Sequence, residues 1–178
     1  MRPGFSARAS GRRNLAFAML LNNPGQLTER LKPGARLLGL DVGSKTIGLA
    51  LSDGTLTIAS PYDTIRRKKF GVDVEILRQV IEKEGVGGLV IGLPVNMDGT
   101  EGPRCQSTRQ FQKNLDKQID LPMAFWDERL STAAVERVLI GDADLSRKRR
   151  AEVVDKMAAA YILQGALDRM KAGSDQLP

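Results

Sequence analysis

The alternation of apolar and polar residues predicts a β-hairpin as the first regular structure of the chain. Residues 36–42 and 46–52 each fit a short strand, and a tight turn of three residues joins them. Successive side chains of a strand point to opposite faces, so Asp41 shares a face with Leu37 and Gly39. In the second strand, small residues alternate with large apolar ones, which leaves one face open to close packing.

The later segments alternate between strand and helix patterns. The predicted elements are, in order, an extended segment at 56–64, a helix at 72–84, a strand at 88–93, a loop at 92–102, a helix at 103–119, a strand at 121–126, a helix from Ser131 or Thr132 to about Ile140, a polar segment at 141–150 and a helix at 151–171. An antiparallel meander followed by right-handed crossovers predicts an α/β domain. Its mixed five-stranded sheet has the order 3-2-1-4-5 and helices flank it, which is the layout expected of a ribonuclease-H-like fold.

The length of 178 residues predicts one domain with an appendage. Residues 1–34 lack a clear period and are expected to form a basic, loosely ordered extension, with a short helix possible at 27–31. The domain is expected at 35–173 and a tail at 174–178. The extension also has the composition of an organellar transit peptide, and Met19 is an alternative initiator. Its one apolar run, at 16–21, is too short to span a membrane.

The amino-acid composition excludes several catalytic mechanisms and one kind of metal site. The chain has no histidine, which excludes Ser-His-Asp and Cys-His nucleophilic schemes, histidine bases and histidine-bound zinc. Its single cysteine, Cys105, cannot form an intramolecular disulfide, and this favours a reducing compartment. Chemistry must therefore use carboxylates, lysine, arginine, hydroxyls and any metal that they bind.

The positive charge is concentrated at the start of the chain. Residues 1–35 hold six basic residues against one acid, a net charge of +5 out of +6 for the whole chain. A basic arm suits nucleic acid, although solubility alone could explain it.

Acidic residues follow the predicted strands at the edge where ligand sites form in parallel sheets. Asp41 ends the first strand, and Asp127 and Glu128 follow the fifth. Asp155 lies in the last helix on the same side as several alanines, which would let the helix approach the sheet closely. Two or three converging carboxylates without histidine or thiol are a ligand set for Mg²⁺ or Mn²⁺. Such a site suits attack of water on a phosphodiester.

Each acid also has a structural interpretation. Asp127 and Glu128 could pair with Arg129 or cap the next helix, and Asp155 could pair with Arg169 or the basic run at 147–150. Glu128 lies two strands from Asp41, about 10 Å between backbones. The reserve candidates are therefore Asp98 and Glu101, which follow the neighbouring fourth strand.

Four motifs in order resemble those of the YqgF family, Holliday-junction-resolvase-like nucleases of bacteria. They are Leu38-Gly-Leu-Asp-Val-Gly-Ser-Lys-Thr-Ile-Gly-Leu-Ala-Leu-Ser-Asp53, Gly92-Leu-Pro-Val-Asn-Met-Asp-Gly-Thr-Glu-Gly102, Asp127-Glu-Arg-Leu-Ser-Thr132 and Asp155-Lys-Met-Ala-Ala-Ala-Tyr-Ile-Leu-Gln164. The resemblance covers roughly residues 36–171. The first motif departs from the family in having Thr46 where arginine is frequent, which puts a phosphate contact there in doubt.

The resemblance implies a ribonuclease-H-like fold, divalent-metal phosphodiester cleavage and cytoplasmic ribosome maturation, with action on precursor 16S ribosomal RNA (rRNA). The catalytic and metal-binding acids that it implies are Asp41, Glu128 and Asp155. Our candidates for phosphate contacts are Lys45, Arg104, Arg129 and Arg150.

Three other functions stay open from the sequence. The chain could resolve a Holliday junction in DNA, or bind nucleic acid on the same fold without catalysis. A third alternative is an ATP-binding domain, because residues 41–48 resemble the first phosphate loop of actin-like kinases, but 178 residues cannot supply the two domains such enzymes need. The residues do not fix the oligomeric state.

Overall fold

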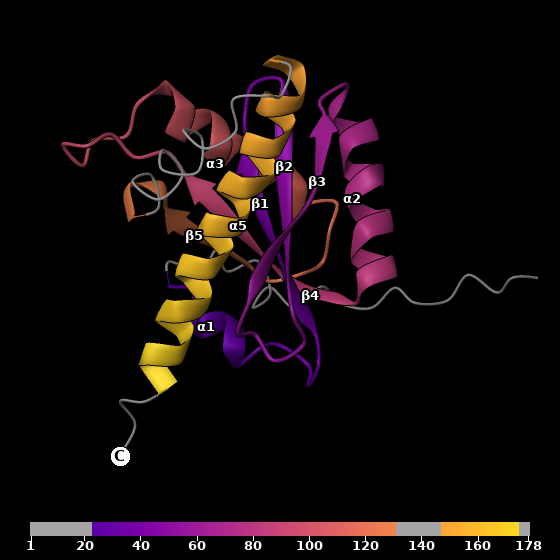
Figure 1. The fold of residues 1–178 in the computed structure, drawn as a ribbon, viewed down its shortest axis with the longest axis vertical. Helices are drawn as coiled ribbons and strands as arrows, with labels where there is room; N and C mark the ends of the chain where they lie inside the picture. Colours follow the sequence, from indigo (N-terminus) through magenta and orange to yellow (C-terminus); the bar gives the residue numbers. More distant parts are fainter. Residues whose placement is uncertain (1–22, 131–146, 175–178) are drawn as a thin grey trace, which may run out of the picture.

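The computed structural model describes residues 23–130 and 147–174 and contains the predicted mixed sheet (Figure 1). The strands lie in the order β3-β2-β1-β4-β5, which confirms the predicted order. Their bounds are β1 Arg36–Val42, β2 Thr46–Ser52, β3 Ala59–Arg66, β4 Val86–Leu93 and β5 Met123–Asp127. β2 runs antiparallel to both β1 and β3, whereas β4 runs parallel to β1 and β5 parallel to β4. The carboxyl ends of β1, β4 and β5 therefore meet at one edge.

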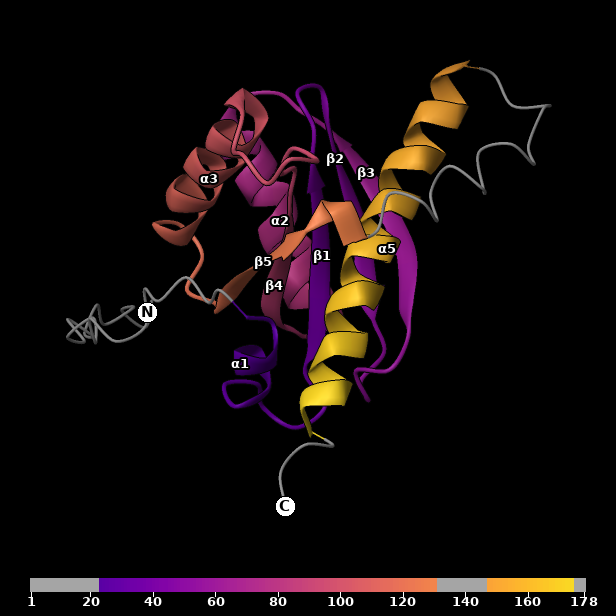
Figure 2. The same cartoon turned by 90° about the vertical axis from the view of Figure 1, so that its left-hand side faces the viewer.

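Helices cover both faces of the sheet in a three-layer arrangement (Figure 2). Their bounds are α1 Gly25–Thr28, α2 Phe70–Glu84, α3 Pro103–Asp116 and α5 Arg147–Ser174, with a 3₁₀ turn η1 at Glu128–Leu130. α2 and α3 lie on one face, and the long α5 crosses the other. In the described ranges, no helix is both long enough and apolar enough to cross a membrane.

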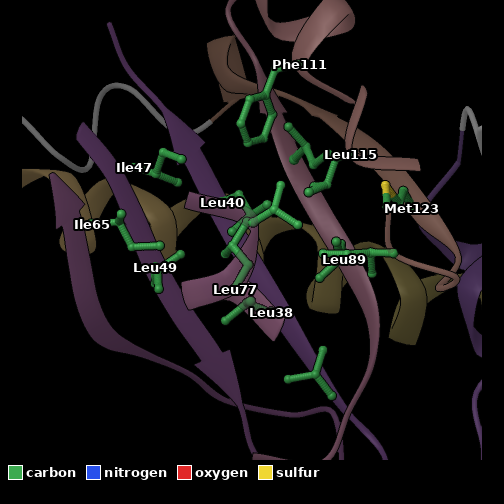
Figure 3. Close-up of a cluster of buried hydrophobic side chains, with 14 of the residues drawn as sticks. Leu38, Leu40, Ile47, Leu49, Ile65, Leu77, Leu89, Phe111, Leu115 and Met123 are labelled. Atoms are coloured by element: carbon green, nitrogen blue, oxygen red, sulfur yellow. The ribbon is translucent and has the colours of Figure 1, made fainter. Parts of the chain in front are cut away.

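Strand alternation divides the core into two apolar clusters. Leu38 and Leu40 point toward α2 and α3, while Leu37 points toward α5, as the pattern predicts. The larger cluster fills the α2–α3 side with fully buried leucines and Phe111 (Figure 3). Burial of apolar side chains from both layers thus fixes which face of β1 carries Asp41, namely the α5 face.

Small residues allow α5 to lie close against the sheet. A β-carbon added to Gly39 would lie 2.8 Å from the Cβ of Leu163 and 3.0 Å from the carbonyl oxygen of Ala159. On the helix side of the same interface, a β-carbon added to Gly165 of α5 would lie 2.6 Å from the ring of Trp126, a residue of the sheet. These distances are shorter than ordinary van der Waals contacts, so larger side chains would push the layers apart.

Two predicted boundaries are wrong for identifiable reasons. The third strand begins at Ala59 instead of residue 56, because the Asp53 carboxylate accepts the backbone N–H groups of Thr57 and Ile58 at 2.7 and 3.0 Å. These hydrogen bonds hold the preceding segment in a turn. The closing helix begins at Arg147, so the end of the predicted polar segment is helical.

The other ends differ from prediction by one to three residues. α2 begins two residues early, β4 begins two residues early, α3 ends at Asp116 instead of 119, and β5 begins at Met123 and ends at Asp127. The predicted helix from 131 to about 140 lies outside the described residues.

The described part of the predicted extension, residues 23–34, packs on the domain. Its helix α1 spans Gly25–Thr28, not 27–31, and Leu27 is fully buried in the cluster beneath α5. This portion is therefore not loosely ordered. The division of the chain at residue 34 stays a prediction, as does the tail at 174–178.

Candidate active site

Asp41 lies near the end of β1 between two residues that have no side chain. It pairs across the antiparallel ladder with Gly48 of β2. On its other side, the parallel register that joins Leu40 to Ile91 brings Gly92 of β4 alongside it. The neighbouring strands therefore place no side chain beside the carboxylate, on the face that α5 covers.

The space above Gly48 is filled by the backbone of α5. A β-carbon at Gly48 would lie only 2.0 Å from the carbonyl oxygen of Asp155, so glycine is required for this approach. The side chain of Asp155 is held at the sheet edge, where the hydroxyl of Thr46 donates to its Oδ2 at 2.7 Å. The predicted inward acid of the last helix thus reaches the neighbourhood of Asp41.

Gly92 allows the Glu128 side chain to extend toward Asp41 across the intervening strand. Glu128 begins the η1 turn directly after β5, two strands from Asp41. Its Oε1 would lie 2.6 Å from a β-carbon at Gly92, which means that the carboxylate lies over β4, the strand between. The side chain thereby bridges most of the separation that made Glu128 doubtful from the sequence.

The electrostatics of Asp41 and Glu128 reflect burial near like charges. The pKa of Asp41 is raised to about 6, chiefly by burial and then by the charge of Asp155, against the lowering effect of Arg104. The pKa of Glu128 is raised to about 7, chiefly by burial and then by the charges of Asp41 and Asp127, against the lowering effect of Arg104. Ionisation of both carboxylates is therefore unfavourable in the metal-free protein, because Arg104 compensates their negative charge only in part.

The donor set fits a hard divalent cation such as Mg²⁺ or Mn²⁺. Asp41 interacts electrostatically with both Asp155 and Glu128, so it is the acid common to two pairs. The described acids and thiols form no ready-made group of three around an ion. The hydrogen bond from Thr46 occupies one of the two Asp155 oxygens. Oxygen ligands and incompletely compensated charge are what these cations prefer.

We expect Mg²⁺ to raise the melting temperature of the protein more at pH 8 than at pH 5. The raised pKa values mean that Asp41 and Glu128 contribute their full share of stability below pH 4 and lose it as the pH rises through about 6 and 7. A cation can restore that loss only once both groups are ionised. Thermal unfolding with Mg²⁺ or chelator at each pH measures the difference, and an equal shift at both values would contradict it.

Two of the four candidate phosphate contacts lie near the carboxylates. Arg104, exposed in the first turn of α3, lowers the pKa of both Asp41 and Glu128 and therefore faces the site. Lys45 is exposed in the turn between β1 and β2, four residues beyond Asp41. Their contact with phosphate stays a prediction.

The other two candidates are placed less directly. The guanidinium of Arg129 is engaged by Asp127, with an Nη2–Oδ2 distance of 2.6 Å and Nε 3.0 Å from each oxygen. This is the structural pairing considered for Asp127 from the sequence. The side chain of Arg150 lies outside the described residues, so its role also stays a prediction.

The two reserve acids, Asp98 and Glu101, interact with residues outside the Asp41 site. Asp98 accepts hydrogen bonds from the backbone and hydroxyl of Thr100, which lower its pKa. Glu101 forms an ion pair with Arg109, whose Nε lies 2.8 Å from Oε2, and this pairing lowers the pKa of Glu101. Among the described acids, the structure thus favours Glu128 over either as the partner of Asp41.

The sequence interpretation missed two residues that shape the site. Thr46 stands out in the sequence only as a departure from the family motif, yet it positions Asp155. Gly92 falls in both the predicted strand and the predicted loop, and neither pattern reveals that it admits Glu128. A glycine inside an apolar strand can signal close approach of another group.

Comparison with known proteins identifies close relatives over the whole domain. A family model, RuvX, described as Holliday junction resolvase, matches residues 35–169. A protein of Paramagnetospirillum magneticum named "Putative pre-16S rRNA nuclease" is 68% identical over 145 residues, covering 82% of this chain and 93% of the relative. A protein of the same name from Roseobacter denitrificans is 56% identical over 155 residues, covering 86% and 94%.

A solved structure supports the fold independently. The yeast mitochondrial Holliday junction resolvase superposes with a TM-score of 0.50 at 10% identity, covering 84% of this chain and 85% of that one. At this identity the likeness concerns the fold alone, and it confirms the predicted ribonuclease-H-like architecture.

Proposed function

Because this chain belongs to the RuvX family, we propose that it is a divalent-metal-dependent nuclease that processes the precursor of 16S rRNA. The observation that carries the proposal is the placement of Asp155 and Glu128 on either side of Asp41 at one sheet edge. The names of the relatives point to RNA as the substrate. Such a role corresponds to the cytoplasmic location that the sequence resemblance implies.

In this function Asp41, Glu128 and Asp155 would hold one or two Mg²⁺ or Mn²⁺ ions. A metal bound there would supply Lewis-acid stabilisation of the attacking and leaving oxygens of the phosphodiester. Thr46 fixes the Asp155 carboxylate, while the glycines beside Asp41 let the other two acids approach. Arg104 places a positive charge beside the carboxylates, where it can attract the scissile phosphate.

Cleavage is expected to require Mg²⁺ or Mn²⁺ and to fail with Ca²⁺. The longer bonds and looser geometry of Ca²⁺ misplace the reacting oxygens. Single-turnover cleavage in each metal and in excess chelator measures the requirement, and we expect a loss of at least about 10³-fold without metal, or about 4 kcal/mol. Full activity in excess chelator would contradict the metal-dependent mechanism.

A second candidate substrate is a four-way DNA junction, which the description of the family model favours. The deciding experiment compares cleavage of matched precursor rRNA and junction DNA by the same preparation. Preferential cleavage of the RNA supports the proposed function, whereas preferential junction cleavage assigns the site to DNA. Binding without cleavage of either would identify a non-catalytic nucleic-acid-binding protein.

A further inference from the structure

A run of four basic residues, 66–69, lies at the same end of the sheet as Asp41 and has no part in the site described above. We call this run the basic turn. Arg66 pairs with Thr46 in the ladder between β2 and β3, and the N–H of Arg67 donates to the carbonyl of Lys45 at 2.9 Å. The basic turn and the turn between β1 and β2 are therefore side by side, at the top of the sheet in Figure 1.

Arg67 connects the basic turn by a hydrogen bond to the backbone that follows Asp41. Its Nη1 donates to the carbonyl oxygen of Gly43 at 2.7 Å, two residues after Asp41. Its guanidinium also lies over the Phe111 ring, 5.4 Å from the centroid, and its Nε is 3.9 Å from Oδ2 of Asp73. With this residue held from three sides, the position of the basic turn is fixed relative to the carboxylates.

A buried carboxylate reinforces this arrangement. Asp73 is 0% exposed, and its Oδ1 accepts the backbone N–H of Lys68 at 3.0 Å. In the described part of the chain its Oδ2 has no hydrogen-bond partner and faces only the more distant Nε of Arg67. Burying a carboxylate is costly unless it is paired. The buried Asp73 carboxylate thus holds the basic turn in one conformation, although its burial is energetically unfavourable.

The positive charge of this surface is only partly balanced. Arg66 forms an ion pair with Glu152, and Arg67 lies near Asp73. The three lysines beside them are exposed and make no ion pair with any acid in the described ranges; they are Lys45, Lys68 and Lys69. Like charges held close together repel, so a rigid surface of this kind is suited to a polyanion.

We propose that Lys45, Lys68 and Lys69 form a second phosphate-binding surface, which holds the substrate backbone on the β3 side of the carboxylates. Arg104 marks the other side, because it faces both Asp41 and Glu128. The nucleic-acid backbone would then run from α3 across the site to the basic turn. This inference rests on the proposed nuclease function and adds a direction for the bound strand. It concerns phosphates, so it holds for RNA and DNA alike.

The test measures how the affinity for nucleic acid depends on salt. In an Asp41→Asn background, which keeps the substrate intact, we compare K68Q/K69Q with the matched control K113Q/K117Q, two exposed lysines of the α3 region. The dissociation constant for precursor rRNA is measured over a series of salt concentrations. Each lost phosphate contact should lower the slope of log affinity on log salt by about 0.7 to 0.9, hence by about 1.5 for the pair. The control should keep the parent slope.

A third variant, K45Q, tests the surface from the neighbouring turn and should lower the slope by about 0.7 to 0.9. The same series with four-way junction DNA separates a general phosphate contact from one made only with RNA. If the parent binds and the wild type cleaves, but K68Q/K69Q and K45Q keep the parent slope on both substrates, these lysines do not contact the substrate backbone and the inference is wrong while the function stands. Absence of both binding and cleavage in the wild type would overturn both.

Discussion

Asp41→Asn should abolish cleavage while leaving the fold and RNA binding nearly intact. The substitution keeps the volume of the side chain but removes the charge common to both carboxylate pairs, with Asp155 and with Glu128. We expect the single-turnover rate to fall by at least about 10³-fold, which corresponds to about 4 kcal/mol of transition-state stabilisation. Removing a charge that is half-buried among like charges should leave the metal-free protein as stable as the wild type, or more so.

Asp120→Asn is the matched control for this experiment. Asp120 is exposed and precedes β5, at the opposite end of the strands from Asp41. It undergoes the same chemical change without touching the site, so its rate should equal that of the wild type. If Asp41→Asn keeps more than about a tenth of the wild-type rate, a loss under about 1.4 kcal/mol, then Asp41 is not an essential ligand.

Of the glycine-to-alanine substitutions at the site, Gly48→Ala should destabilise the protein most. The new β-carbon would lie 2.0 Å from the carbonyl oxygen and 2.4 Å from the carbonyl carbon of Asp155. These atoms belong to the backbone of a 28-residue helix, which cannot yield locally as a flexible side chain can. Overpacking of this kind costs about 3 kcal/mol, and more where the backbone must move.

The same displacement should also remove activity, since Asp155 would leave its hydrogen bond with Thr46. Chemical denaturation gives the loss of stability, and cleavage at a temperature where the variant stays folded gives the loss of activity. Gly71→Ala is the control, because nothing lies within 4 Å of a β-carbon at that helical position. Its stability should stay within about 1 kcal/mol of the wild type. Equal stabilities for the two variants would show that α5 does not depend on Gly48.

Much of the fold could be predicted because its signals are local. The first two strands were predicted with the bounds that the structure has, since their apolar alternation spans each strand and a turn separates them. Element ends were less accurate where a single side chain decides them. The Asp53 carboxylate, for example, delays β3 by binding two backbone N–H groups, and no periodic pattern reveals that.

The sequence by itself determined which acids stand at strand ends and on the inner side of the last helix, because residue spacing fixes the face on which a side chain lies. It also excluded histidine and thiol-pair chemistry by composition. It could not decide whether Glu128 reaches Asp41 across two strands. Only the tertiary structure decided this, because the answer depends on the room that the missing side chains of Gly92 and Gly48 leave for Glu128 and for the Asp155 backbone. Such space exists only where β4, β5 and α5 are packed against β1, and no local pattern encodes distances between layers.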